Sequence, residues 1–207
     1  MGRTKIIDDD ELIRVARDVF RETGHTATTR DVARAAGISQ AVLYQRFGSK
    51  EDLFLRAMTP ELPDVAALLG PYPPRSAKAD LRRIAERLAE FFAAMMPTLL
   101  HVLAHPDLGA GRLKQWHTRL PFVPIAHGLA ERIRRLQADG QIAQVNAEAA
   151  AHTLIAAVHT VALLETMPHG GHANHGAHAS HGAHADHPAT QLGAVVEVLW
   201  SGLAPRA

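Results

Sequence analysis

Apolar residues recur at every third and fourth position along most of the chain, and this spacing is the strongest constraint on its fold. In residues 9–22, Leu12, Val15, Ala16 and Val19 repeat at the period of a helix. No run alternates apolar and polar residues for long enough to form a half-buried strand. The sequence therefore predicts an all-α fold.

Prolines, glycines and capping residues set the expected limits of the other helices. The prolines crowded between residues 59 and 75 predict a connector with one helical turn at residues 65–69. Pro97 predicts a kink or a break in a long helix that begins near Ala77. Residues 107–119 have no clear pattern. The remaining helices are expected at about residues 29–36, 39–46, 50–58, 121–139, 146–167 and 188–203.

Composition excludes several classes of protein. The 207 residues include no cysteine, so disulfides and thiolate metal sites are excluded. The polar, acidic start is unlike a signal peptide, and the most apolar helix carries Glu148 and Glu165, so we expect no membrane span and a cytoplasmic protein. No nucleophile elbow, phosphate loop, zinc-protease motif or paired-carboxylate pattern is present, so we expect no enzyme.

Charge is unevenly distributed along the chain. The formal net charge is only +1. Between residues 25 and 50, however, Arg30, Arg34, Arg46 and Lys50 face Asp31 alone. A local excess of positive charge is what binding to nucleic-acid phosphates requires.

The same segment contains two short helices joined by a glycine turn. Thr28 and Asp31 have the spacing of a capping box, and Gly37 stands where the turn needs a positive φ. This arrangement is typical of a helix-turn-helix, although a generic two-helix hairpin has it too. The expected core of this segment is Val32, Ala33, Ala36, Val42, Leu43, Phe47, Leu53 and Phe54, packed against Val15, Val19 and Phe20.

Individual residues carry the pattern further. Thr28-Thr29-Arg30 precedes Val32-Ala33, Ala36-Gly37-Ile38-Ser39 forms the turn, Leu43-Tyr44 follows, and Phe47 precedes Ser49-Lys50-Glu51-Asp52-Leu53. Over about residues 11–58 the sequence closely resembles the tetracycline-repressor (TetR) family. Beyond Met58 the similarity is architectural. The resemblance implies an N-terminal three-helix helix-turn-helix domain (residues 1–58) followed by a helical ligand-binding and dimerisation domain (residues 59–207).

The resemblance also implies roles for residues of the first domain. Thr29 would hold a phosphate, and Arg30 would reach a phosphate or a guanine edge. Gln40, Ala41 and Val42 would face the bases. Tyr44, which has a core role as an alternative, and Lys50 would contact the DNA backbone. Gln45 and Arg46 depart from the pattern of many relatives, which leaves the preferred operator open. The expected DNA-binding set is Thr28, Thr29, Arg30, Ser39, Gln40, Ala41, Val42, Tyr44, Gln45, Arg46 and Lys50.

The second domain is expected to pair two chains and to bind an effector. The apolar helix at residues 146–167 and the helix at 188–203 suit a four-helix dimer interface, with a buried helix inside one subunit as the alternative. A dimer implies a near-palindromic operator, and a mostly apolar small molecule would release the repressor from it. The ligand candidates are Met95, Met96, Leu99, Leu103, Trp116, Phe122, Ile125 and His127.

A histidine-rich loop at residues 169–187 separates these two helices. Its imidazoles fall at a strict spacing of three, and they suit Zn, Ni, Co or Cu(II). The alternatives are a metal-responsive regulator and a disordered loop that binds metal incidentally; no cofactor is otherwise required. The candidate ligands are His169, His172, His175, His178, His181, His184 and His187.

Overall fold

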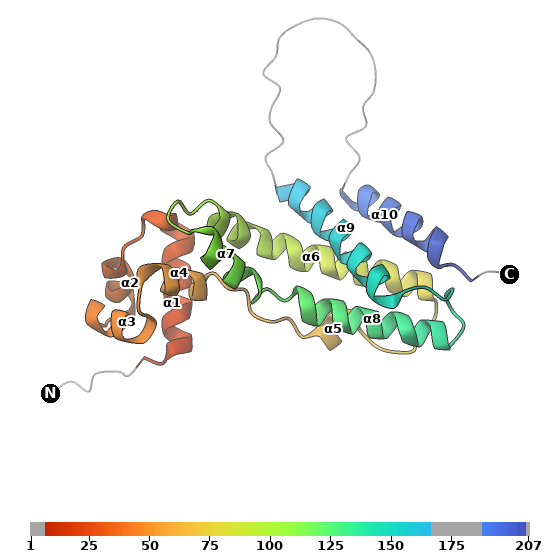
Figure 1. Cartoon of the computed structure of the whole chain (residues 1–207), viewed down its shortest axis with the longest axis horizontal. Coiled ribbons are helices and arrows are strands. Elements are labelled where there is room, and N and C mark those ends of the chain that lie inside the picture. Colours follow the sequence, from red (N-terminus) through yellow and green to blue (C-terminus); the bar gives the residue numbers. More distant parts are fainter. Residues whose placement is uncertain (1–6, 167–187, 206–207) are drawn as a thin grey trace, which may run out of the picture. The chain divides into compact units, whose positions relative to one another are not determined.

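The computed structural model describes residues 7–166 and 188–205, and every regular element in these ranges is a helix (Figure 1). The all-α prediction is confirmed. The element that the sequence left unclear is the single helix α7. The elements are α1 (Asp9–Thr23), the 3-10 turn η1 (Gly24–Thr26), α2 (Thr29–Ala36), α3 (Gln40–Phe47), α4 (Lys50–Ala57), α5 (Val65–Leu69), α6 (Ala77–Leu103), α7 (Ala110–His117), α8 (Phe122–Ala138), α9 (Ala147–Thr166) and α10 (Pro188–Leu203).

The chain forms two compact units. The first combines the residues up to Leu62 with Pro97–Pro121, and the second combines Pro63–Met96 with the residues from Phe122 onward. The division falls inside α6, because Pro97 lies within that helix and does not end it. Residues 97–121 thus group with the N-terminal helices, whereas the domain division at residue 58 stays a prediction from the sequence.

Side-chain caps begin the helices of the first unit. Thr28 and Asp31 form the predicted capping box, and the hydrogen bonds from the Thr28 hydroxyl and amide lower the pKa of the Asp31 carboxyl. Gly37 ends α2 at φ +68°, the left-handed conformation expected of it. Ser39 caps α3 by accepting from the Val42 amide. Local sequence therefore fixes the turn between α2 and α3.

The core of the first unit lies against one line of α1. Leu12, Ala16 and Phe20 are fully buried, and the Phe20 ring meets the edge of Phe54 at 5.0 Å. The expectation that Val15 and Val19 supply this core is wrong, since both are only partly buried. Residues four apart lie in one row along a helix, and the row from Leu12 to Phe20 is the one that faces α2 and α4.

In the second unit, α9 packs against α8 and α10. One side of α9 is buried, including Leu154 and Val158, whereas Ala149, Thr153 and Ala156 on the other side are exposed. The alternative prediction of a helix buried on all sides within one subunit is therefore wrong, whereas its burial in a dimer stays a prediction. By length and composition α9 could cross a membrane, as core helices of soluble proteins also can, with a mean hydropathy of 1.4 over its most apolar window.

A buried charge cluster joins α5, α6 and α8 within the second unit. Arg132 is 5% exposed and donates to the carbonyls of Leu69 (3.0 Å), Pro71 (2.9 Å) and Gly70. Its guanidinium lies 3.8 Å from the buried carboxylate of Asp80, which also pairs with Arg83. The carbonyls after α5 therefore accept hydrogen bonds from a side chain more than sixty residues away, and the Leu69 carbonyl accepts a second one from Arg83.

Candidate functional site

Helices α2 and α3 bring three predicted site residues together. The Thr29 hydroxyl accepts a hydrogen bond from Gln40 Nε2 at 3.0 Å and lies 3.2 Å from the Tyr44 hydroxyl. Thr29 is 6% exposed, whereas Tyr44 is 49% exposed. We call Thr29, Gln40 and Tyr44 the Thr29 cluster. Thr29 holds the other two in position, and Tyr44 is half exposed to solvent instead of packed in the core.

The outer face of α3 is open. Ala41, Tyr44 and Gln45 are exposed, and Val42 is partly buried beside the fully packed Leu43. Arg30, near the start of α2, is also exposed. This face therefore offers an aromatic hydroxyl, an amide, small apolar groups and a guanidinium, which are the groups that read base edges and phosphates.

Arg46 and Lys50 point to other parts of the first unit. Arg46 donates to the Ile7 carbonyl at 2.7 Å and lies 3.4 Å from the Asp9 carboxylate. Lys50 donates to the His25 carbonyl at 2.7 Å. An ammonium has three donors, so this bond fixes Lys50 and leaves two donors for a phosphate. Arg46 instead ties the end of α3 to the start of α1.

The segment at residues 97–121 packs on α4 inside the same unit. Arg112 of α7 lies 3.4 Å from Asp52 and 3.9 Å from Glu51. The centroid of the buried His105 ring lies 4.7 Å from that of the tilted Phe54 ring and 5.8 Å from that of the His25 ring, which it meets edge-on. Glu51 and Asp52, in the first turn of α4, are therefore held by residues 97–121, a segment that the sequence assigned to the other domain.

Burial of His105 predicts that acid destabilises the first unit. Burial lowers the pKa of its imidazole, and Nδ1 accepts a hydrogen bond from the Asp107 amide, which needs the neutral ring. The neutral His105 ring contributes its full stabilisation above the unfolded-state pKa of about 6.5. This stabilisation is lost as the pH falls through the lower pKa of His105 in the folded protein. Urea unfolding between pH 7.5 and 5 should show a steeper loss in the wild type than in His105→Gln. The exposed His101→Gln should keep the wild-type slope, and equal slopes in all three proteins would contradict the prediction.

Comparison with known proteins agrees with this geometry. Residues 12–57 match the family of bacterial regulatory proteins called the tetR family. Residues 12–57 therefore belong to the N-terminal domain of the TetR family. The matched residues cover α1 to α4 and thus include the Thr29 cluster and the exposed face of α3. No curated protein matches the chain.

Solved structures share the TetR fold across both units. The flavonoid-responsive regulator FrrA is 21% identical with a TM-score of 0.61, covering 96% of this chain and 97% of its own. A TetR-family regulator from Pseudomonas syringae is 17% identical with a TM-score of 0.65, covering 97% of this chain and 100% of its own. FadR from Bacillus subtilis, solved with stearoyl-CoA, is 14% identical with a TM-score of 0.62, covering 94% of this chain and 99% of its own. At these identities the similarity is one of fold.

The predicted ligand residues are divided between the two units. Leu99, Leu103 and Trp116 belong to the first unit, and the other five belong to the second. Met95, Met96 and Ile125 are buried, whereas Leu103 and His127 are exposed. His127 lines a surface hollow beside Arg132 and Tyr72.

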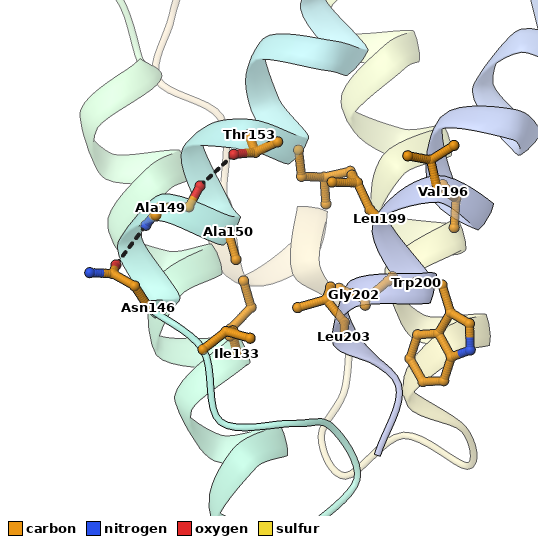
Figure 2. A pocket seen from close by; sticks show the side chains of 14 residues that line it. Ile133, Asn146, Ala149, Ala150, Thr153, Val196, Leu199, Trp200, Gly202 and Leu203 are labelled. Carbon is orange, nitrogen blue, oxygen red and sulfur yellow. Dashed lines mark hydrogen bonds between the residues drawn. The ribbon is translucent and has the colours of Figure 1, made fainter. Parts of the chain in front are cut away.

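A pocket of about 330 Å³ lies elsewhere in the second unit (Figure 2). We call it the α9–α10 pocket, because those helices supply most of its wall, with Leu81 of α6 and Ile133 of α8 deeper in the unit. In Figure 2, Leu199 and Leu203 of α10 face Ala150 of α9 and Ile133 across it. None of the eight predicted ligand residues lines this pocket. The sequence had assigned Ala149, Ala150 and Leu199 to the dimer interface.

The predicted metal ligands lie outside the described residues. All seven histidines from His169 to His187 fall between the described ranges. Within residues 7–166 and 188–205, no group of three or more His, Asp or Glu side chains is placed to hold a metal ion. His101, four residues before His105, is exposed and bonds the Pro97 carbonyl through Nδ1.

Proposed function

We propose that this TetR-family regulator is a repressor that binds a specific operator through α2 and α3 and leaves it when a small apolar effector binds the second unit. The exposed face of α3 above the Thr29 cluster carries the proposal, because its groups match those that contact bases and phosphates. We expect it to act in the cytoplasm, without catalysis and without a membrane partner.

The effector part of the proposal takes support from the relatives. FrrA is described as flavonoid-responsive, and FadR was solved with stearoyl-CoA. Flavonoids and stearoyl-CoA both have large apolar portions. An effector changes DNA binding only if it binds two arrangements of the dimer with different affinities. We propose that a mostly apolar molecule does so here.

Selection of bound fragments from genomic DNA, with the intact protein, tests the proposed function. We expect enrichment of a near-palindromic sequence whose half-sites lie about one helical turn apart, as two α3 helices in a symmetric dimer require. The genes beside the enriched sites would identify the regulated process. Recovery of fragments without a shared motif would contradict sequence-specific regulation.

We further propose that two chains pair through the exposed sides of α9 and α10. The hydroxyls of Thr153 and Thr160 bond the Ala149 and Ala156 carbonyls, so their methyl groups remain for contact with another surface. Small side chains on α9 allow close approach of a second helix. Val198 on α10 is 72% exposed and borders the same pocket as Ala149 and Thr153 of α9, so these three side chains could meet a second chain together.

Val198→Asp should therefore convert the dimer into monomers. The side chain is exposed within the chain, so the charge would leave the subunit folded and oppose its pairing. Light scattering at micromolar concentration should report a halved mass. Val123→Asp is the control, because Val123 of α8 is 75% exposed but lies off these two helices. A wild-type monomer at the same concentration would contradict the proposed dimer. Val196, which the sequence placed in the interface, is 4% exposed and packs inside the subunit, so it is unsuited to this test.

A further inference from the structure

The α9–α10 pocket has the dimensions and surface of a small-molecule site. Its volume of about 330 Å³ is at the lower end of the range, about 300–1,000 Å³, in which ligand pockets fall. It extends inward to Leu81, Ile133 and Leu154, which are buried in the core of the second unit. The pocket therefore reaches from the surface of α9 and α10 to core residues of the second unit.

The side chains that line the α9–α10 pocket determine which kind of ligand it can bind. No charged residue is among the described side chains that line the pocket. Two of its polar atoms bond the backbone of α9, since Asn146 Oδ1 accepts from the Ala149 amide and Thr153 Oγ1 donates to the Ala149 carbonyl (Figure 2). A charged ligand would lose its hydration here without a counter-charge. The indole of Trp200 supplies an aromatic wall.

Small residues create the space. A Cβ added to Gly202 would meet no atom within 4 Å, and Ala149 and Ala150 fill little of the opposite wall. Ala149, Thr153, Val198 and Gly202 are exposed, so the pocket opens on the same face that we propose for pairing. A molecule bound here would be covered by the second chain and would thus change how the two chains meet.

We propose that the α9–α10 pocket binds a neutral, mostly apolar small molecule, one per chain. This site is distinct from the ligand residues expected from the sequence. The inference rests on the proposed function, in which an apolar effector controls DNA binding, and it identifies the walls that receive the effector.

Two related probes test the chemistry of the site in the full chain without DNA. N-phenyl-1-naphthylamine is neutral, and 8-anilino-1-naphthalenesulfonate has the same rings with a sulfonate. Fluorescence titration should give saturable binding of the neutral probe, at least about tenfold tighter than the sulfonate. In Trp116→Phe, where Trp200 is the remaining tryptophan, the neutral probe should quench tryptophan emission. Equal binding of both probes, or no quenching of Trp200, would overturn the proposal.

Filling the pocket tests its location. Gly202→Leu places a side chain in the open space and should weaken the neutral probe by about tenfold or more. Gly193→Leu, on the same helix and also without a neighbour within 4 Å, lies outside the pocket and should retain binding. Ala149→Leu fills the opposite wall and serves if Gly202→Leu does not fold. Wild-type affinity in the filled variants would overturn the proposal.

Two further measurements separate the alternatives. If rising protein concentration displaces the probe, side chains of the second copy fill the pocket and the proposal is wrong. Operator binding is measured separately in the same proteins. Failure of the wild type to bind any operator would contradict the proposed function alone. The proposed function and the proposed pocket would both be supported if the operator is bound and the neutral probe changes that binding in the wild type but not in Gly202→Leu.

Discussion

Tyr44→Ala combined with Lys50→Ala should weaken operator binding by about 100-fold or more, because we propose that these two side chains contact the DNA backbone. Tyr44 is half exposed beside the Thr29 hydroxyl, and Lys50 is positioned by its bond to the His25 carbonyl. Neither side chain belongs to the buried core of the first unit. The loss should therefore reflect binding and not unfolding. Fluorescence anisotropy on the selected operator, at several salt concentrations, measures it.

Salt dependence distinguishes this result from a general loss of charge. Removal of the Lys50 ammonium should reduce the slope of log K against log salt by about one. Arg34→Ala removes the same charge from an exposed side chain on α2 that pairs with Asp31, and it should alter operator affinity far less. An unchanged affinity in the Tyr44 and Lys50 double variant would remove these residues from the interface.

The largest effect on stability is expected from Arg132→Met. The substitution keeps an apolar stem but removes the hydrogen bonds that Arg132 donates to the carbonyls of Leu69, Gly70 and Pro71, of which Leu69 alone keeps a second donor, Arg83. It also leaves the buried Asp80 carboxylate with only Arg83 as a counter-charge. Loss of one partner from such a buried pair costs about 3–5 kcal/mol. Urea unfolding should show a midpoint well below that of the wild type.

Two companion variants make the Arg132 test specific. Arg134→Met removes an exposed arginine from the same helix, where ion pairs with Glu131 and Glu148 contribute little, and its midpoint should stay near the wild-type value. Asp80→Leu added to Arg132→Met should recover part of the loss, because no carboxylate then remains buried. If Arg132→Met unfolds at the same urea concentration as Arg134→Met, the cluster does not stabilise the second unit.

Much of the DNA-binding segment could be predicted from neighbouring residues. The capping box at Thr28 and Asp31, the left-handed Gly37 and the cap at Ser39 each depend on groups no more than four residues apart. Of the α1 residues expected in the core, Phe20 was predicted correctly, whereas Val15 and Val19 were not. Leu12, Val15, Ala16, Val19 and Phe20 all fit the helical period, and only the position of α4 selects among them.

The sequence by itself therefore determined the helical class, the limits of most helices and the helix-turn-helix with its family, since these follow from periodicity and local hydrogen bonding. Tertiary structure decided which groups far apart in the chain meet. It buried Arg132 against carbonyls near residue 70, placed Arg112 beside Asp52, and left a pocket between α9 and α10 where the sequence suggested only apolar packing. The physical reason is that side-chain burial and open volume depend on the packing of several helices, which no single helix's pattern specifies.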